Sequence, residues 1–213
     1  MRTIMVLNAK GGCGKTTLAT NIASYFAFEE EKIVTLADMD PQGSSSEWLK
    51  ARGEEWPEIH GLDGTKDTSK PPRETEVLVL DAPARVQGKE LTALVRRAET
   101  IIVPVLPSPI DMRAAAHFIK DLLVVGKVSR NQTKVAVIAN RVRENTRVYD
   151  SLYSFLRALK IPFIGTLRDT QNYIRAAERG IGIYEMAPSQ VYQDVEQWAS
   201  IVRWLRSKRS QAD

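Results

Sequence analysis

The segment Ala9-Lys10-Gly11-Gly12-Cys13-Gly14-Lys15-Thr16-Thr17 decides how the rest of this chain is interpreted. An apolar run that ends at Leu7 precedes it, and a helical pattern begins at Gly14. Glycines allow consecutive backbone N–H groups to converge on one concavity, where they can bind phosphate oxygens. A helix that starts here adds its positive N-terminal end. The segment therefore predicts a phosphate-binding loop between a strand and a helix.

Two side chains of this loop suit a nucleoside triphosphate with its magnesium ion. Lys15 should reach the β and γ phosphates, and the Thr16 hydroxyl should bind Mg²⁺. The common pattern G-x-x-x-x-G-K-[ST] is not met, because Ala9 stands where that pattern has its first glycine. We interpret Cys13 as a small packing residue and not as a nucleophile. The predicted nucleotide-binding residues of the loop are Gly11, Gly12, Cys13, Gly14, Lys15, Thr16 and Thr17.

Outward from the loop, short β-branched runs alternate with helical patterns. We expect strands over Thr3–Leu7, Lys32–Ala37, Glu76–Leu80, Thr100–Leu106, Lys134–Asn140 and Pro162–Leu167. We expect helices over Gly14–Phe28, Ser44–Arg52, Gly88–Ala98, Ile110–Gly126, Thr146–Lys160, Thr170–Arg179 and Gln190–Lys208. This alternation is typical of an α/β fold, with a mostly parallel twisted sheet and helices on both faces. Ligands of such folds bind at the carboxyl ends of the strands.

The composition fits one globular domain over residues 1–213, because 43% of the residues are hydrophobic and 26% are charged. The polar stretch Gly53–Arg73 contains several prolines and glycines, so we expect a surface loop there. The N-terminus has no signal-peptide pattern, and no apolar run is long enough to span a membrane, so we expect a cytoplasmic protein. Cys13 is the only cysteine, which excludes an internal disulfide.

Acidic residues follow two of the expected strands. The segment Asp38-Met39-Asp40-Pro41-Gln42-Gly43 ends the second strand, and Asp81 follows an apolar run at 77–80. Two carboxylates at positions i and i+2 of a strand point to the same side. One of them can support Mg²⁺, and the other can orient an attacking water.

Together these segments resemble the ParA/MinD family of ATPases, which carry a variant phosphate loop on a P-loop NTPase fold. In that family the early lysine, here Lys10, crosses a dimer interface to the phosphates of the partner subunit. The resemblance implies Lys10, Lys15 and Asp40 as catalytic residues, with Asp40 at the attacking water. It implies Thr16, Asp38 and Asp81 as the metal-binding residues, with Asp81 holding Mg²⁺ through a water.

The base site is implied by Asn140-Arg141 at the end of a late strand, which is similar to the adenine-binding position of the family. GTPases of the wider class have Asn-Lys-x-Asp there, whereas this chain continues with Val142 and Arg143, which favours ATP. The chain begins directly at its first strand, so it is similar to the small ParA type without an N-terminal DNA-reading domain.

The resemblance implies an ATP-dependent homodimer that binds nonspecific DNA and positions a plasmid, a chromosome or a protein assembly. A ParB-like partner would stimulate ATP hydrolysis, and the ATP-bound protein would associate with the nucleoid. The second half of the chain is basic, which is compatible with a polyanionic partner. The candidate DNA-binding residues are Arg141, Arg143, Arg147, Arg168, Arg175, Arg179, Arg203, Arg206, Lys208 and Arg209.

Three alternatives belong to other functional classes. A MinD-like membrane-cycling protein would use Val195, Trp198, Val202 and Leu205 as the apolar face of a basic terminal helix. We expect instead that this helix packs on the core, because Asp194 and Glu196 interrupt its basic face. An iron-protein-like electron donor would need two cluster cysteines. A nucleotide sensor that does not hydrolyse ATP remains open.

Overall fold

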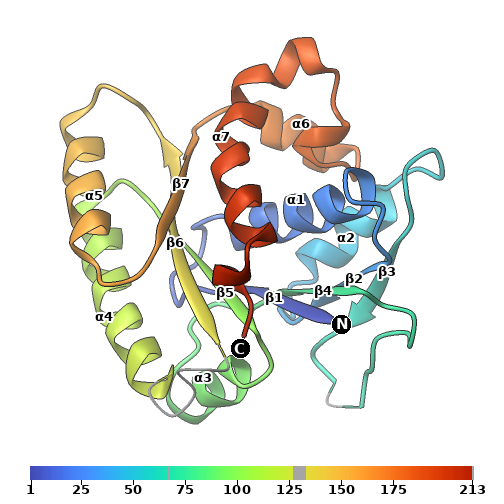
Figure 1. The fold of residues 1–213 in the computed structure, drawn as a ribbon, viewed down its shortest axis with the longest axis horizontal. Helices are drawn as coiled ribbons and strands as arrows, with labels where there is room; N and C mark the ends of the chain where they lie inside the picture. Colours follow the sequence, from blue (N-terminus) through green and yellow to red (C-terminus); the bar gives the residue numbers. More distant parts are fainter. Residues whose placement is uncertain (67, 127–132, 213) are drawn as a thin grey trace. The chain divides into compact units, whose positions relative to one another are not determined.

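The computed structural model describes residues 1–66, 68–126 and 133–212, and strands alternate with helices along it (Figure 1). The strands are β1 (Arg2–Val6), β2 (Val34–Asp38), β3 (Ile59–Asp63), β4 (Val77–Asp81), β5 (Thr100–Val105), β6 (Lys134–Val142) and β7 (Phe163–Arg168). The helices are α1 (Lys15–Phe28), α2 (Ser44–Ala51), α3 (Gly88–Val95), α4 (Pro109–Gly126), α5 (Arg147–Ala158), α6 (Asn172–Glu178) and α7 (Pro188–Arg206), with short 3₁₀ turns η2 (Ile183–Glu185) and η3 (Lys208–Ser210).

The strands form a seven-stranded sheet in the order β3-β2-β4-β1-β5-β6-β7. The pairings β1–β4, β2–β3, β2–β4, β5–β6 and β6–β7 are all parallel. Every residue of β2, β4 and β5 is buried, as expected for strands of a parallel sheet that is covered on both faces. The predicted α/β fold with a parallel sheet is confirmed.

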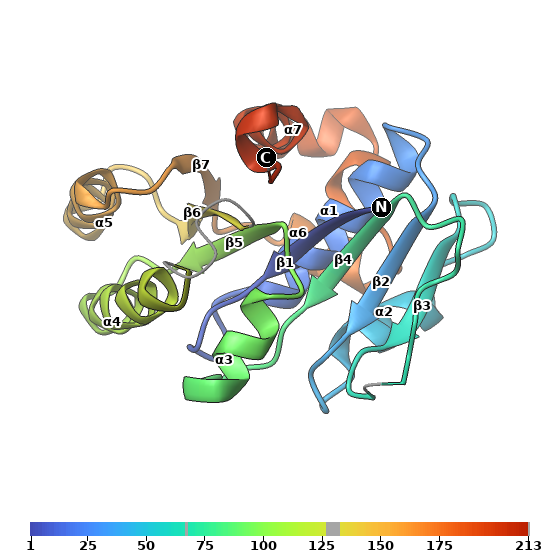
Figure 2. The ribbon, with the colours of Figure 1, turned by 60° about the horizontal axis from the view of Figure 1, so that its bottom comes forward.

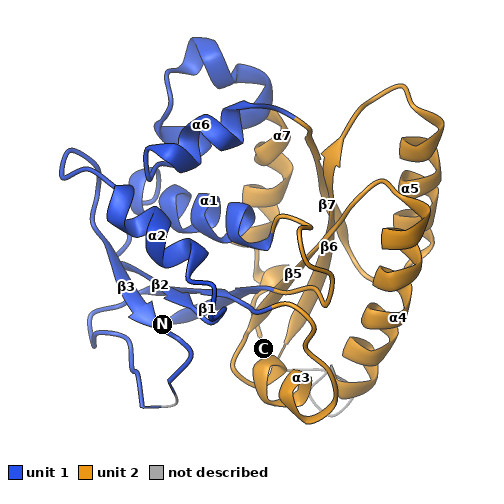
Figure 3. Ribbon diagram, turned by 180° about the vertical axis from the view of Figure 1, so that it is seen from behind, with its two compact units in different colours: residues 1–6, 15–83, 170–195 blue, residues 7–14, 84–169, 196–213 orange. Residues whose placement is uncertain are grey.

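The chain divides into two units, each assembled from separate segments (Figure 3). Unit 1 comprises Met1–Val6, Lys15–Pro83 and Thr170–Val195, and unit 2 comprises Leu7–Gly14, Ala84–Asp169 and Glu196–Asp213. The sequence predicted one domain over 1–213, without an internal boundary. The phosphate loop crosses from unit 2 to unit 1 at the peptide bond between Gly14 and Lys15.

In unit 1, helices α1 and α2 pack on one face of the strands β3-β2-β4-β1 (Figures 1 and 3). The register places Asp38 beside Asp81, Asp81 beside Val6, and Asp38 beside Asp63. Since these residues end their strands, three aspartates lie in one row at the carboxyl ends.

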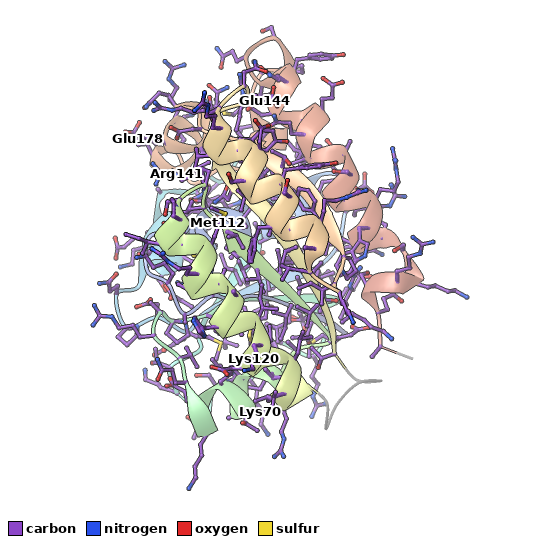
Figure 4. All side chains as sticks on the ribbon, turned by 90° about the vertical axis from the view of Figure 1, so that its left-hand side faces the viewer. Lys70, Met112, Lys120, Arg141, Glu144 and Glu178 are labelled. Carbon is purple, nitrogen blue, oxygen red and sulfur yellow. The ribbon has the colours of Figure 1, made fainter. Side chains whose placement is uncertain are left out.

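In unit 2, α4 and α5 run side by side over one face of β5, β6 and β7 (Figure 4). Residues 196–206 of α7 lie on the opposite face of the same strands (Figure 2). Gln197 fastens this part of α7 to β7, because its Oε1 accepts a hydrogen bond from Arg168 N at 2.9 Å.

The structure corrects the expectation for Gly53–Arg73, because β3 lies inside the stretch that we predicted to be a loop. Ile59 is its only buried residue, while Gly61 and Asp63 are exposed. A strand at the edge of a sheet needs only one hydrogen-bonded neighbour and little apolar surface. The polar composition therefore concealed it.

The expectation for the terminal helix is confirmed. Trp198, Ile201 and Leu205 of α7 are fully buried, so the apolar face belongs to the core. In the described part of the chain, no helix has both the length and the apolar character that a membrane crossing requires.

A buried ion pair fixes the end of α2 within unit 1. The Arg52 guanidinium contacts both carboxylate oxygens of Glu185, at 3.0 and 2.5 Å, and also donates to Gly180 O and Pro57 O. The two side chains are 5% and 0% exposed. Because nearly all water is excluded, each charge depends on the other for its stability.

We predict that Arg52→Leu lowers the free energy of unfolding by about 3–5 kcal/mol, because it leaves the Glu185 carboxylate buried without its counter-ion. The control is Lys50→Ala, which removes an exposed ion pair with Glu47 and should cost less than about 1 kcal/mol. Urea denaturation measures both values. Equal, small losses would show that the buried pair contributes little.

Candidate nucleotide-binding site

The first half of the phosphate loop is held in unit 2 by the end of β5. Leu7 N donates to Ile102 O at 2.9 Å, and Asn8 Nδ2 donates to Pro104 O at 2.7 Å. Asn8 Oδ1 in turn accepts a hydrogen bond from Lys10 N at 3.0 Å. The sequence analysis missed Asn8, although an asparagine shortly before a glycine-rich turn is a signal that could have indicated it.

The curvature of the loop depends on Gly12 and Gly14, whose φ angles are +74° and +92°. A Cβ on Gly12 would meet open space, whereas a Cβ on Gly14 would collide with Asn140 Nδ2. That nitrogen donates a hydrogen bond to Cys13 O at 2.8 Å. Asn140, which we predicted at the adenine, is thus bound to the phosphate loop itself and is 5% exposed.

Of two further loop residues, Cys13 is buried and the Lys10 side chain is partly exposed. Cys13 is buried, and its thiol donates to Lys10 O at 3.2 Å, which supports a packing role. The Lys10 side chain is 43% exposed, with Nζ 3.8 Å from Asp111 Oδ1 in the first turn of α4. Ser108 Oγ hydrogen-bonds the other oxygen of that carboxylate. Lys10 therefore lies at the surface beside a counter-ion.

In unit 1, Lys15 and Thr16 begin α1 near the carboxyl end of β4. Lys15 is 8% exposed and Asp81 is 1% exposed. Burial raises the pKa of Asp81 to about 6, although the nearby hydroxyl groups of Thr16 and Ser45 act in the opposite direction. Nearby Asp38 raises this pKa further, and Lys15 lowers it. Thr16, Lys15 and Asp38 therefore all lie close enough to Asp81 to influence its carboxylate.

Asp38, which ends β2, and Asp40, which follows the strand, differ in their surroundings. The Asp38 carboxylate accepts hydrogen bonds from Asp40 N at 3.2 Å and from Ser46 N at 2.8 Å. Both of its oxygens are therefore engaged by backbone N–H groups, and one of these groups lies in the first turn of α2. Asp40 is half-buried, and its Oδ1 accepts a hydrogen bond from Gln42 N. Of the pair, Asp40 is the more accessible to a ligand or water.

The side chains at the end of β4 fit a magnesium ion that is bound mainly by phosphate and water. Asp81 Oδ2 is buried and has no hydrogen-bond partner among the described residues. The Thr16 hydroxyl lies beside the same carboxylate. No group of three or more His, Cys, Asp or Glu side chains suited to a metal occurs in residues 1–66, 68–126 and 133–212. This pattern fits Mg²⁺, which takes few protein ligands beside nucleotide phosphates.

The candidate DNA-binding residues are distributed over both units of the chain. In unit 2, Arg141 lies near the carboxyl end of β6 and Arg143 follows this strand, and both pair with Asp169. Arg147 begins α5. Figure 4 shows Arg141 with Glu144 in this region. Arg168 ends β7 at the same edge. Arg175 and Arg179 lie at α6 in unit 1, while Arg203, Arg206, Lys208 and Arg209 lie around the end of α7 in unit 2.

We predict that Gly14→Ala lowers the free energy of unfolding of the nucleotide-free protein by about 2–4 kcal/mol, because alanine resists positive φ and its Cβ would collide with Asn140. Gly11→Ala is the matched control, since its Cβ would meet no atom within 4 Å. That variant should stay within about 1 kcal/mol of the wild type. Urea denaturation separates the two, and equal values would contradict the proposed close contact.

We predict that Asp81→Asn stabilises the nucleotide-free protein at pH 7 in EDTA by about 1–3 kcal/mol, because it removes a buried charge. The folded-state pKa of Asp81 lies above its ordinary value of 3.8, at about 6. The free energy of unfolding of the wild type therefore falls as the pH rises from about 4 through 6, because the buried carboxyl group then becomes ionised. Asp81→Asn has no carboxyl group at this position, so it lacks this decrease.

The control for Asp81→Asn is Asp63→Asn, two strands away. Hydrogen bonds from Lys66 and Thr65 lower the pKa of the exposed Asp63 to about 2, so its removal should not stabilise the protein. Thermal unfolding over a pH series measures both variants. A lower melting temperature for Asp81→Asn at pH 7 would be the contrary result.

Comparisons with known proteins agree with this geometry. Residues 4–183 match the family model of the CobQ/CobB/MinD/ParA nucleotide binding domain. Two proteins called Maintenance of carboxysome distribution protein A are similar over 86% of this chain. The one from Halothiobacillus neapolitanus is 26% identical over 87% of its length, and the one from Gloeobacter kilaueensis is 31% identical over 84%.

The structure of an ATP complex of a Cyanothece McdA variant is also similar. It has a TM-score of 0.70 at 15% identity, covering 95% of this chain and 96% of that one. The chain therefore belongs to the CobQ/CobB/MinD/ParA family of nucleotide-binding domains, as its resemblance to ParA and MinD led us to expect.

Proposed function

We propose that this protein is a Mg-ATP-dependent ATPase that dimerises when ATP is bound and positions a cargo in the cytoplasm. The observation that carries the proposal is the Lys15, Thr16 and Asp81 cluster at the start of α1, directly after a loop with two glycines in positive φ. The family match and the ATP complex of a similar structure support the choice of nucleotide.

The phosphates would lie against the backbone N–H groups of the loop. Gly11 and Gly12 leave open space where a side chain would otherwise stand. Lys15 then neutralises the phosphate charge from the start of α1, and Thr16 and Asp81 hold the magnesium ion. When bound, Mg²⁺ neutralises the negative charge that develops on the phosphate oxygens.

Hydrolysis needs a group that orients water at the γ phosphate, and we assign this task to Asp40. Its backbone is set by hydrogen bonds within the turn from Asp38 to Gly43, and Gly43 has a φ of +70°. The neighbouring Asp38 instead holds the start of α2. We therefore propose that Asp38 influences the metal region through position and charge, while Asp40 acts on the water.

Asn140 favours adenine over guanine in this proposal. Its amide nitrogen is occupied by Cys13 O, so its carbonyl oxygen remains to contact a base. A carbonyl oxygen accepts hydrogen bonds, and adenine offers a 6-amino donor where guanine has an oxygen acceptor. Arg141 follows with a φ of +53°, at an irregularity in the pairing of β6 with β7.

Lys10 connects ATP binding to dimerisation. Its exposed ammonium group lies beside Asp111 in this chain, and a second subunit would offer it the phosphates of the other ATP. Fixed positive charge at the transferring phosphoryl group is an established means of stabilising its transition state. A dimer formed in this way exists only while ATP is present.

The cargo is suggested by the names of the relatives, which refer to carboxysome distribution. We propose a protein assembly, a plasmid or a chromosome as cargo, with nonspecific DNA as the track and a ParB-like partner that stimulates hydrolysis. The ATP-bound dimer would then associate with the nucleoid. The burial of Trp198 and Leu205 argues against α7 as a membrane-binding helix in the MinD-like alternative.

We predict that Lys15→Ala lowers ATP affinity at least about tenfold, because it removes a phosphate contact in a dry site. Lys10→Ala should retain ATP binding and lose ATP-dependent dimerisation. Isothermal titration with Mg-ATP measures binding, and light scattering on a sizing column measures the dimer. A wild type with high ATP affinity and no measurable hydrolysis would identify a nucleotide sensor and overturn the ATPase proposal.

A further inference from the structure

Two acidic segments of unit 1 lie side by side where strands β2 and β3 begin (Figure 1). Residues 28–33 lead from the end of α1 to β2, and residues 52–58 lead from α2 to β3. The rings of Phe28 and Trp56 connect the two segments, with centroids 6.0 Å apart and an angle of 64° between their planes. We call residues 28–33 and 52–58 together the acidic edge.

A hollow of about 380 Å³ lies within unit 1 between the end of α2 and the start of β3. Its lining combines apolar side chains with two carboxylates, from Leu49, Trp56, Pro57, Ile59, Glu54 and Glu58. Arg52 also lines the hollow, but its guanidinium is held by Glu185. Phe28, which is 38% exposed, extends the apolar surface from the end of α1. The hollow is of a size that can receive side chains of a bound partner.

The acidic edge has a large excess of negative charge. Its six acidic residues are Glu29, Glu30, Glu31, Glu54, Glu55 and Glu58. Lys32 and Arg52 are the only lysine and arginine of these segments, and they pair with Glu76 and Glu185, which lie outside them. The described residues offer no ion pair to four of the six, Glu29, Glu31, Glu54 and Glu55. Such a concentration of one sign of charge attracts a partner of the opposite sign.

Local stability does not account for the acidic run that follows α1. Glu29, Glu30 and Glu31 come directly after the last residue of this helix, where the negative end of the helix dipole disfavours a carboxylate. Glu31 also has a φ of +51°, a conformation that side chains other than asparagine and aspartate resist. Only Glu30 gains a local contact, because Tyr25 Oη donates to its Oε1 at 2.7 Å. The run therefore reduces the stability of the free protein, and a cationic partner is the better explanation for it.

We propose that the acidic edge docks a segment of a partner protein that is rich in arginine and lysine. The pair of Phe28 and Trp56 would receive a guanidinium group, because arginine stacks on aromatic rings. The surrounding carboxylates would pair with the other cations of the segment. Carboxylates on two separate segments call for several linked cations, so a peptide fits this surface better than a single ion. The same charge repels DNA and anionic lipids.

The acidic edge is separate from the candidate nucleotide site of unit 1. Val34 begins β2 beside the acidic edge, and Asp38 ends the same strand next to Asp81. Four steps of about 3.3 Å along the strand place the two ends roughly 13 Å apart. A partner at the acidic edge therefore leaves the phosphate-binding residues accessible, and its binding requires no ATP. Docking at the acidic edge thus goes beyond the proposed function, because it adds a contact that persists in every nucleotide state.

The test uses the full chain and three short labelled peptides of equal length. The first alternates arginine with serine, and in the other two lysine or glutamate replaces every arginine. Fluorescence anisotropy measures their affinity with and without Mg-ATP over a salt series. Glu54→Gln/Glu58→Gln and Glu29→Gln/Glu31→Gln alter the acidic edge, and Trp56→Leu removes one ring of the aromatic pair. Glu90→Gln/Glu196→Gln removes two exposed carboxylates of unit 2 as a charge-matched control.

We expect the arginine peptide to bind the wild type more tightly than the lysine peptide, and the glutamate peptide not to bind. Each double variant of the acidic edge should weaken the arginine peptide about three- to tenfold, because exposed ion pairs are individually weak. Added salt should reduce this difference, since it screens exposed charges. Trp56→Leu should reduce the preference for arginine over lysine. The control variant and Mg-ATP should leave the affinity unchanged.

Thermal unfolding distinguishes a lost contact from a damaged fold. Glu29→Gln/Glu31→Gln should raise the melting temperature while it weakens binding, because it removes negative charge from the negative end of α1. Wild-type affinity in both double variants of the acidic edge, or an equal loss in the control, would overturn the proposal. Peptide binding that occurs only with Mg-ATP would overturn it as well. Spermidine that binds as tightly as the arginine peptide would identify a site for small cations and contradict peptide docking.

Discussion

The hydrogen bond from Asn140 to Cys13 O is the interaction on which the phosphate loop depends. A loop that binds anions must keep most of its own N–H groups available, so it is held mainly through side chains and through its carbonyl oxygens. Asn140 Nδ2 donates to Cys13 O, Asn8 Oδ1 accepts from Lys10 N, and Arg85 N donates to Ala9 O. Gly14 makes this possible, because it has no Cβ in the space that the Asn140 amide occupies.

The buried carboxylate of Asp81 is a second feature that constrains the candidate site. Asp81 is nearly inaccessible to water, and burial raises its pKa. Without a ligand this arrangement reduces stability, because the ionised group has lost most of its hydration. The same exclusion of water strengthens its attraction to a cation. Under the proposed function, this lost stability would be offset by a site that is prepared for magnesium and phosphate, a frequent compromise where function requires a buried charge.

The sequence predicted the buried strands near the phosphate loop correctly, but it missed a strand at the edge of the sheet. Strands β2, β4 and β5 are mostly apolar and buried throughout, so composition predicted their existence. Edge strand β3 was missed, because only Ile59 needs to be buried there. The role of Asp38 at the start of α2 was also hidden, since it depends on a hydrogen bond to Ser46 that no motif describes.

The sequence by itself determined the order of the strands and helices except β3, the glycine-rich loop and the acidic strand ends, because these depend on local conformation and on burial along a single segment. Only the tertiary structure decided that Asn140 supports Cys13, that Arg52 pairs with Glu185, and that Thr100 donates a hydrogen bond to Ser210 O. Such contacts join residues far apart in the chain. They exist only after the sheet has brought the ends of its strands together, so no local pattern could have revealed them.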